Sequence, residues 1–177
     1  MIIDRFWAMP SKNTFSIKPI RELLYEEMRY GGLWLDPFSG GSKLATITND
    51  LNPEIDADYR LESLDFLRLF SNSSADGVLF DPVYSLRQLK ECYESVGLKV
   101  NEPTRSDWWT KRKRQIARII RPGGKCISFG WNSNGIGKSL GFNIVRIVIV
   151  AHGGVHNDTI CTVEIKGEIR YEKRIEL

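Results

Sequence analysis

The stretch Gly77-Val78-Leu79-Phe80-Asp81-Pro82-Val83-Tyr84 decides how this chain folds. Its first half is an apolar run of strand length, which ends abruptly in Asp-Pro before a helical pattern begins at Leu86. In an open α/β sheet, ligands bind where such a strand ends. The stretch therefore predicts a buried strand that presents a carboxylate, a proline-fixed carbonyl and an aromatic ring together. This combination suits a flat base bearing an amino group, although a helix-capping aspartate beside a core tyrosine has the same pattern.

Strand-like and helix-like patterns alternate along the rest of the chain, which predicts an α/β fold. Residues 17–30 have a helical apolar face, with Pro19 in the first turn and two glycines as the stop. Further helices are expected over residues 64–70, 86–96 and 106–121, the last with Ser106-Asp107 as its N-cap. Strands are expected at residues 33–35, 45–48, 59–61, 77–80, 125–129, 142–151 and 159–166. Residues 5–16 are expected to form an ordered loop.

The last two expected strands are joined by a turn-rich connection without a helical segment, which predicts an antiparallel hairpin. The charged tail from Glu168 to Leu177 is expected to be an edge strand or a frayed end. No stretch has the composition of a linker or a repeat, so a single domain is expected over residues 1–177.

Composition and charge limit the cellular compartments and the kinds of binding partner that the sequence favours. The net charge of +3 is too small to indicate nucleic-acid binding by itself. Three widely spaced cysteines predict neither a disulfide framework nor a zinc site, which favours a reducing cytoplasm. The sequence has no signal-peptide pattern and no apolar run long enough to span a bilayer. We therefore expect a soluble, cytoplasmic protein without a membrane partner.

Two further acids follow expected strands. Asp36 heads the glycine-rich turn Asp36-Pro37-Phe38-Ser39-Gly40-Gly41-Ser42, and Asp50 follows the strand at 45–48. Glycines let the backbone approach a ligand, and acids at strand ends hold ribose hydroxyls in Rossmann-like folds. The two acids therefore predict a nucleoside pocket. The few residues between the glycine turn and the next strand are too few for a crossover helix.

The expected helix at 106–121 carries the densest positive charge, together with two tryptophans. Trp108 and Trp109 could stack on bases while Lys111 and Arg112 contact phosphates, which predicts a nucleic-acid surface. The alternative is an amphipathic helix whose tryptophans face the core and whose basic side is solvated. Both interpretations stay open for at least one of the two rings.

Two other patterns are rejected as sites. The loop from Gly130 to Gly141 misses the spacing of a phosphate-binding P-loop, so nucleotide triphosphate binding is not expected. His152 and His156 have no neighbouring acid or thiol pattern, so a loop or rim role is expected and no metal site is predicted.

Four signals in order, Asp36-Pro-Phe-x-Gly, Asn49-Asp-x-Asn-Pro, Asp81-Pro-x-Tyr and Arg121-Pro-Gly-Gly, resemble the S-adenosylmethionine-dependent DNA adenine amino-methyltransferases, especially compact phage-type members. The resemblance covers nearly the whole chain. It implies a Rossmann-like class I methyltransferase fold, with a seven-stranded, mostly parallel sheet in which only the last strand is antiparallel. It also implies S-adenosylmethionine as cofactor and DNA as partner.

The resemblance implies specific roles for residues of this chain. The loop from Phe6 to Phe15, with Trp7, Met9 and Pro10, looks like the amino-terminal cofactor-binding segment. The resemblance places Asp36, Phe38 and Gly40 at the methionine end of the cofactor, Asp50 at its ribose and Asp65 at its adenine. Asp81, Pro82 and Tyr84 are implied to grip the target base.

The chain departs from the family pattern in three places. Val83 stands where the family has a second proline, the first crossover helix is short or missing, and no block is large enough for a separate target-recognition domain. Specificity is therefore expected from loops, a partner or a dimer. Two alternatives stay open: an RNA or protein-amide methyltransferase, and a catalytically silent, cofactor-binding phage accessory protein. If the chain is phage-encoded, the compartment is the host cytoplasm.

Overall fold

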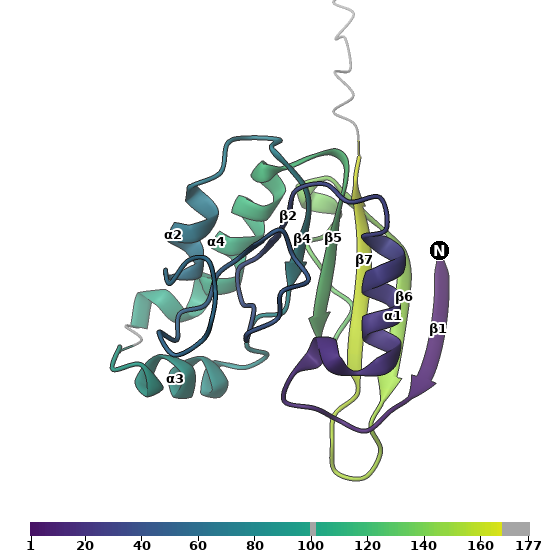
Figure 1. The fold of residues 1–177 in the computed structure, drawn as a ribbon, viewed down its shortest axis with the longest axis horizontal. Coiled ribbons are helices and arrows are strands. Elements are labelled where there is room, and N and C mark those ends of the chain that lie inside the picture. The colour runs from purple at the N-terminus through teal and green to yellow at the C-terminus, as the bar shows by residue number, and fades with distance from the viewer. Residues whose placement is uncertain (100–101, 168–177) are drawn as a thin grey trace, which may run out of the picture.

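A seven-stranded sheet runs through the residues that the computed structural model describes, 1–99 and 102–167 (Figure 1). Its strands are β1 (Ile2–Trp7), β2 (Trp34–Asp36), β3 (Ile47–Thr48), β4 (Ala75–Phe80), β5 (Ile120–Gly130), β6 (Phe142–Ala151) and β7 (Thr159–Lys166). The spatial order is β1-β6-β7-β5-β4-β2-β3. Only β7 is antiparallel to its neighbours, β5 and β6. The predicted Rossmann-like α/β fold with a mostly parallel sheet and a final antiparallel hairpin is thus confirmed.

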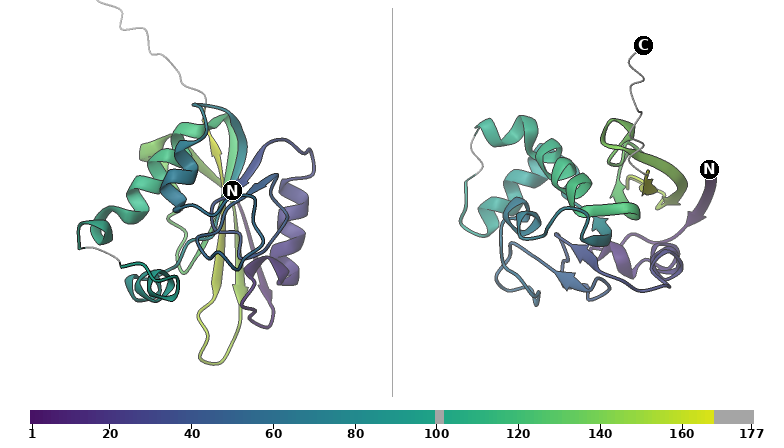
Figure 2. Two further views of the ribbon diagram at one scale, coloured as in Figure 1. Left: turned by 60° about the vertical axis from the view of Figure 1, so that its left-hand side comes forward. Right: turned by 90° about the horizontal axis from the view of Figure 1, so that it is seen from above.

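Helices cover both faces of the sheet. They are α1 (Lys18–Glu27), α2 (Ser63–Arg68), α3 (Leu86–Ser95) and α4 (Glu102–Ile119), with short 3-10 turns at Thr14–Ser16 and Lys138–Leu140. Figure 2 shows α1 on one side of the sheet and α2 with α4 on the other. Successive strand side chains point to opposite faces. Accordingly, Leu79 packs in the cluster with α1, while Val78 and Phe80 pack in the cluster with α2 and α4.

The strand order reverses between β2 and β4. From β2 the chain moves outward to β3, and it returns to β4 on the opposite side of β2. The described residues 37–46 between β2 and β3 contain no helix, as the short spacing predicted. Ligands of open α/β sheets bind at such a switch point, beyond the carboxyl ends of the strands. Here Asp36 ends β2 and Asp81 directly follows β4.

Several predicted boundaries are wrong. Residues 5–7 belong to β1, which pairs in parallel with β6, rather than to a loop. The expected strand at 59–61 is only a single bridge between Tyr59 and Asn49. Helix α4 begins at Glu102, before the predicted N-cap at Ser106-Asp107, and β5 follows it directly at Ile120.

Two expectations concern the limits of what the structure describes. The predicted edge strand or frayed end from Glu168 to Leu177 lies outside the described residues. Among the described helices, none combines the length and the hydropathy that a membrane span requires.

Candidate active site

The turn after β4 is held by side-chain hydrogen bonds. The Tyr84 hydroxyl donates to Asp81 Oδ1 at 2.5 Å, and the Tyr84 backbone N–H donates to Gln88 Oε1 at 2.8 Å. Ser85 caps α3, since its Oγ accepts a hydrogen bond from the backbone N–H of Gln88 at 3.2 Å. Pro82 is buried. The turn therefore presents Asp81 and Tyr84 in a fixed relation to the first turn of α3.

The environment of this turn changes the acidity of both groups. Burial raises the pKa of Asp81, and the hydrogen bond from Tyr84 offsets part of that rise. Burial raises the pKa of Tyr84 as well, and the neighbouring Asp81 charge raises it further. The phenol therefore stays protonated and acts as the donor in this pair.

Val83 stands where the resembled family has proline, and its carbonyl is held from outside the turn. Trp109 Nε1 donates to the Val83 carbonyl oxygen at 3.2 Å. Helix α4 thus supplies a restraint on the turn that does not depend on a proline ring at residue 83.

Asp36 is fully buried at the end of β2. Its Oδ1 accepts the backbone N–H of Phe38 at 3.0 Å, whereas its Oδ2 finds no hydrogen-bond partner among the described residues. The buried hydroxyl of Ser39 is likewise unpartnered within the described part of the chain. Burial raises the pKa of Asp36 well above its ordinary value, and the charges of Asp81 and Asp50 add to the rise. A buried polar group without a partner is costly, so this corner is suited to receive a donor from a ligand.

Asp50 joins the end of β3 to the glycine turn. Its Oδ2 accepts the backbone N–H of Gly40 at 2.9 Å, and its Oδ1 accepts the backbone N–H of Asn52 at 2.9 Å. Gly40 has a φ of 53°, a left-handed conformation that favours glycine. The turn therefore wraps around the Asp50 carboxylate, and both predicted residues lie in one place.

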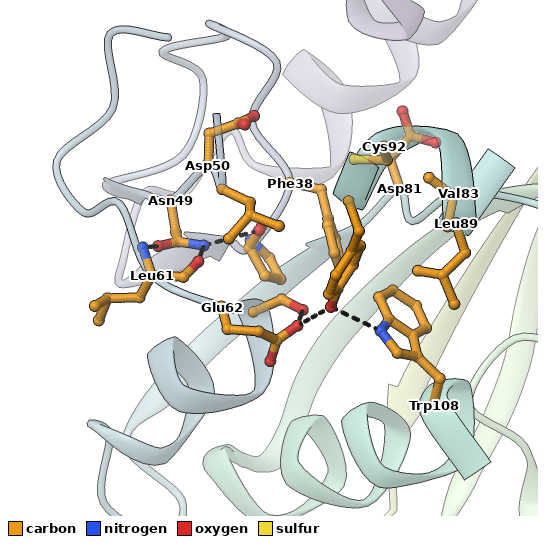
Figure 3. Close-up of a pocket in the computed structure, with 14 residues that line it drawn as sticks. Phe38, Asn49, Asp50, Leu61, Glu62, Asp81, Val83, Leu89, Cys92 and Trp108 are labelled. Atoms are coloured by element: carbon orange, nitrogen blue, oxygen red, sulfur yellow. Dashed lines mark hydrogen bonds between the residues drawn. The ribbon is translucent and has the colours of Figure 1, made fainter. Parts of the chain in front are cut away.

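A cavity of about 130 Å³ lies between the ends of β2 and β4 and helix α3 (Figure 3). Figure 3 shows Asp50 and Glu62 on one side of it and Asp81, Leu89 and Trp108 on the other. Its lining residues come from six segments: Pro37, Phe38, Asn49, Asp50, Leu51, Leu61, Glu62, Ser63, Asp81, Val83, Leu89, Cys92, Tyr93 and Trp108. Apolar walls with a few convergent carboxylates are typical of small-molecule sites.

Glu62 is a lining residue that the sequence analysis missed. Its carboxylate accepts hydrogen bonds from the Tyr93 hydroxyl at 2.6 Å and the Leu64 backbone N–H at 2.7 Å, and it pairs with Arg112. Burial raises its pKa, but the Arg112 charge and these hydrogen bonds outweigh burial, so the pKa lies below its ordinary value. The sequence held one signal for Glu62, because it directly follows the expected strand at residues 59–61. Acids at strand ends are candidate ligand-binding residues.

Asp81 lines two more cavities besides this one. A cavity of about 120 Å³ separates it from the segment Lys12 to Phe15 and from the glycine turn. A more open cavity of about 470 Å³ is bounded by Asp81, Pro82, Val83, Tyr84 and helix α3. The Asp81 carboxylate thus stands where three cavities approach one another.

The structure brings most of the predicted site together. Asp36, Phe38, Gly40, Asp50, Asp81, Pro82 and Tyr84 all lie at the carboxyl ends of β2, β3 and β4 or line the cavities beside them. Pro10 lines a fourth cavity, of about 370 Å³, beside Tyr84. Trp7 and Met9 are exposed and line none of these four cavities. Asp65 is exposed on α2, pairs with Arg68 at 2.9 Å and lines none of these four cavities, and its place at the cofactor adenine stays a prediction.

The predicted nucleic-acid surface on α4 requires a correction. Trp108 and Arg112 are each only 2% exposed, because they stack on each other with the guanidinium 3.5 Å from the ring centre. Arg112 also donates to Ser63 Oγ at 2.6 Å and to the Trp108 carbonyl at 2.8 Å. Both residues therefore belong to the core and cannot reach a nucleic acid. Lys111 is exposed and pairs with Asp107, and Trp109 is half-buried beside the Asp81 turn.

The histidine loop has a structural role. His152 is buried, with Nδ1 2.8 Å from the Ala8 carbonyl oxygen and Nε2 2.9 Å from Thr159 Oγ1. It therefore links the segment after β1 to the start of β7. Over residues 1–99 and 102–167, no cluster of three or more metal-ligating side chains occurs.

Comparison with known proteins identifies similar folds. No protein-family model matches the chain, and no curated protein matches its sequence. TrmN from Thermus thermophilus is similar with a TM-score of 0.55 at 18% identity, over 85% of this chain and 49% of TrmN. The chain therefore spans about half the length of TrmN.

Two enzymes match over most of their own length. A 1,6-didemethyltoxoflavin-N1-methyltransferase from Burkholderia thailandensis, with bound S-adenosylhomocysteine, gives a TM-score of 0.58 at 13% identity, over 89% of this chain and 80% of the enzyme. The N-methyltransferase NodS from Bradyrhizobium japonicum WM9, in complex with S-adenosyl-L-homocysteine, gives 0.53 at 11%, over 89% and 90%. At these identities the similarity concerns the fold.

Proposed function

We propose that this chain is an S-adenosylmethionine-dependent methyltransferase that acts on the exocyclic amino group of adenine in DNA. The observation that carries the proposal is the position of Asp81, which follows β4 at the switch point and lines three cavities. Two proteins of similar fold have S-adenosylhomocysteine bound, which supports the choice of cofactor.

The residues present fit such a cofactor. Among the described residues, Asp36 Oδ2 and the Ser39 hydroxyl have no hydrogen-bond partner. Both can accept hydrogen bonds from the amino group of the cofactor. Asp50 and Glu62 lie where they can accept ribose hydroxyls, and Phe38 and Leu89 supply apolar walls for its adenine. When bound, the cofactor supplies a methyl group activated by a sulfonium.

Asp81 and Pro82 prepare the target amine. The nitrogen lone pair of an aromatic amine is delocalised into the ring. Hydrogen bonds from the amine to the Asp81 carboxylate and the Pro82 carbonyl favour a pyramidal nitrogen and direct its lone pair at the methyl group. The Tyr84 hydroxyl now occupies Asp81 Oδ1, so the amine either displaces it or uses Oδ2. Because the pKa of Asp81 is raised, its carboxylate is also a suitable acceptor for the proton that the amine releases.

The test is transfer of labelled methyl from the cofactor to DNA of mixed sequence. The wild type is expected to label DNA, and Asp81→Asn is expected to lower the rate by about 100-fold or more while cofactor binding persists. Glu22→Gln, which changes an exposed acid of α1 that lines none of the cavities, is the matched control and is expected to keep wild-type activity.

Mass spectrometry of nucleosides from DNA and RNA of expressing cells separates the alternatives. Methylated adenine in RNA alone would replace DNA by RNA as the substrate. Cofactor binding without any methylated nucleic acid would point to a protein amide or to a silent cofactor-binding protein, and would contradict the proposal.

A further inference from the structure

A second aromatic ring stands next to Tyr84 on the outside of the site. Trp131 lies on the loop after β5 and is 43% exposed. Its ring centre is 5.6 Å from that of Tyr84, and the two rings are inclined by 70°. A tryptophan that remains this exposed beside a candidate catalytic turn offers a free face for stacking.

Cavities extend the site from Asp81 to Trp131. The open cavity of about 470 Å³ at Asp81 shares Ser11, Thr14, Tyr84 and Gln88 with the cavity of about 370 Å³ at Pro10. Trp131 lines this second cavity and also another of about 90 Å³. A continuous groove therefore runs from Asp81, past the Tyr84 ring, to the Trp131 ring.

The loop that carries Trp131 is anchored to the sheet. Glu164 of β7 accepts the backbone N–H groups of Ile136 at 2.6 Å and Gly137 at 2.9 Å. At Gly135 a Cβ atom would lie 2.3 Å from Glu164 Oε2, so only glycine lets the loop approach this closely. The Trp131 ring is thus presented by a fixed loop, which lowers the entropy lost when a ligand stacks on it.

The charges along the groove suit a phosphodiester chain. Lys12 lines the cavity at Asp81, and Lys113 of α4 lines the small cavity of about 90 Å³ together with Trp131. Glu91, which also lines the cavity at Asp81, is paired with Arg87 at 2.8 Å. A cation at each end and aromatic faces between them are the features by which proteins hold single strands.

We propose that Trp131 stacks on the base adjacent to the target base, so that the groove holds two successive nucleotides of an unpaired strand. The inference rests on the proposed function for the identity of the target, which stacks on Tyr84. Because the Tyr84 and Trp131 rings are inclined by 70°, bases stacked on them are splayed apart, as they are in unpaired strands and not in a duplex.

The experiment measures binding of a labelled single-stranded oligodeoxynucleotide, with one central adenine between pyrimidines, by fluorescence anisotropy. Trp131→Ala is expected to weaken binding roughly tenfold, and Trp131→Phe, which keeps a ring, is expected to restore most of it. The control is Tyr30→Ala, which removes an aromatic ring that is 84% exposed beside Arg29 and distant from the groove. The oligoribonucleotide of the same sequence distinguishes DNA from RNA. Deoxyadenosine monophosphate has no neighbouring base, so its affinity for Trp131→Ala is expected to equal its affinity for the wild type.

The binding measurements test the stacking site without any measurement of catalysis. Equal affinity of Trp131→Ala and wild type for the oligonucleotide would overturn it, as would a loss of equal size for the mononucleotide. Failure of the wild type to bind either oligonucleotide would also overturn it. Absence of methyl transfer despite a Trp131-dependent affinity would contradict the proposed function and leave the stacking site standing.

Discussion

Asp36 and Asp81 are carboxyl groups at the ends of adjacent strands, and burial raises the pKa of both. A buried acid with an unpartnered oxygen lowers the stability of the folded protein, because hydrogen bonds do not offset the cost of desolvating its charge. Such residues persist where a ligand supplies the missing partner. The local instability at Asp36 is therefore consistent with a binding role rather than with a structural one.

Replacing Asp36 is expected to stabilise the protein and to weaken cofactor binding. Between the ordinary and the raised pKa of Asp36, the folded state keeps a proton that the unfolded state releases, so the free energy of unfolding falls as the pH rises. Asp36→Asn cannot ionise and escapes this loss. Its advantage in melting temperature over the wild type is greatest at alkaline pH and vanishes below about pH 3.9.

Titration calorimetry is the second measurement on the same variant. Asp36→Asn is expected to lose about 1–3 kcal/mol of affinity for S-adenosylhomocysteine, because an amide cannot become the carboxylate that would pair with the amino group of the ligand. Glu22→Gln serves as the control in both measurements. A variant that is less stable than the wild type at alkaline pH would contradict this account of Asp36.

Tyr84→Phe is expected to move the acid limb of the activity profile to higher pH. The hydrogen bond from Tyr84 lowers the pKa of Asp81 against the effect of burial, so its removal raises that pKa further. Only the carboxylate form accepts the target amine, and activity therefore falls earlier as the solution is acidified. Tyr93→Phe, which removes a hydroxyl bonded to Glu62 instead, should leave the limb in place. An unchanged limb in Tyr84→Phe would argue against Asp81 as the ionising group.

At the scale of elements, the ion pair between Arg112 and Glu62 ties α4 to the beginning of α2. Glu62 is the N-cap of α2, and Arg112 reaches it across the helix interface while stacking on Trp108. The same acid lines the candidate cofactor cavity. The packing of α4 therefore positions part of the binding site.

Arg112→Met is expected to lower the free energy of unfolding by about 3 kcal/mol, because it leaves the Glu62 charge without its buried partner. Lys111→Met, at the exposed neighbouring position, is expected to stay within about 0.5 kcal/mol of the wild type. Urea denaturation of both variants checks the difference. Equal effects of the two substitutions on the free energy of unfolding would contradict a buried position for Arg112.

The elements around β4 and the final hairpin could be predicted because their patterns are local. Strand patterns ending in turn residues marked β2, β3, β4, β6 and β7. The three acids at strand ends, Asp36, Asp50 and Asp81, followed from β2, β3 and β4. Strand β1 could not be predicted, because Ile2 to Trp7 does not alternate and is held by pairing with the distant β6. Residues 59–61 have strand composition but make only one bridge, so the expected total of seven strands was reached with one wrong member.

The residues that α4 buries, and the residues they contact, could not be predicted from the sequence for a related reason. Trp108 and Arg112 are four positions apart and share one helix face, yet whether that face meets solvent or α2 depends on tertiary packing. Glu62 was missed because its role arises only when Tyr93 and Arg112 converge on it. The sequence leaves open whether Trp109 lies on a nucleic-acid surface or faces the core, and in the structure its indole restrains the turn at Val83.

At the scale of the whole molecule, one arginine ties the edge strand to a helix. Arg146 of β6 donates to Asp4 of β1 at 2.9 Å and to Glu26 of α1 at 2.8 Å, and Glu27 lies 3.8 Å away. Its hydrogen bond and charge lower the pKa of Glu26. The arginine therefore offsets the repulsion among three acids from two different elements.

Arg146→Ala is expected to free β1 without unfolding the sheet. The loss of stability is expected to be about 1 kcal/mol, since the pairs are partly exposed, but amide hydrogen exchange in residues 2–7 should accelerate more than in β4 or β5. Lys18→Ala, which removes a surface pair with Glu22, is the control. Uniform acceleration throughout the sheet would show that β1 unfolds only together with the rest.

The position of β1 also has a consequence for biosynthesis. Asp4 and Arg146 are 142 residues apart in the chain, so β1 is synthesised well before β6 and must wait for it before the two strands can pair. During that interval Ile2, Ile3, Phe6 and Trp7, which remain substantially exposed even in the folded protein, are open to any chaperone or nascent chain nearby. The length of that delay depends on the rate of translation and not on the stability of the sheet.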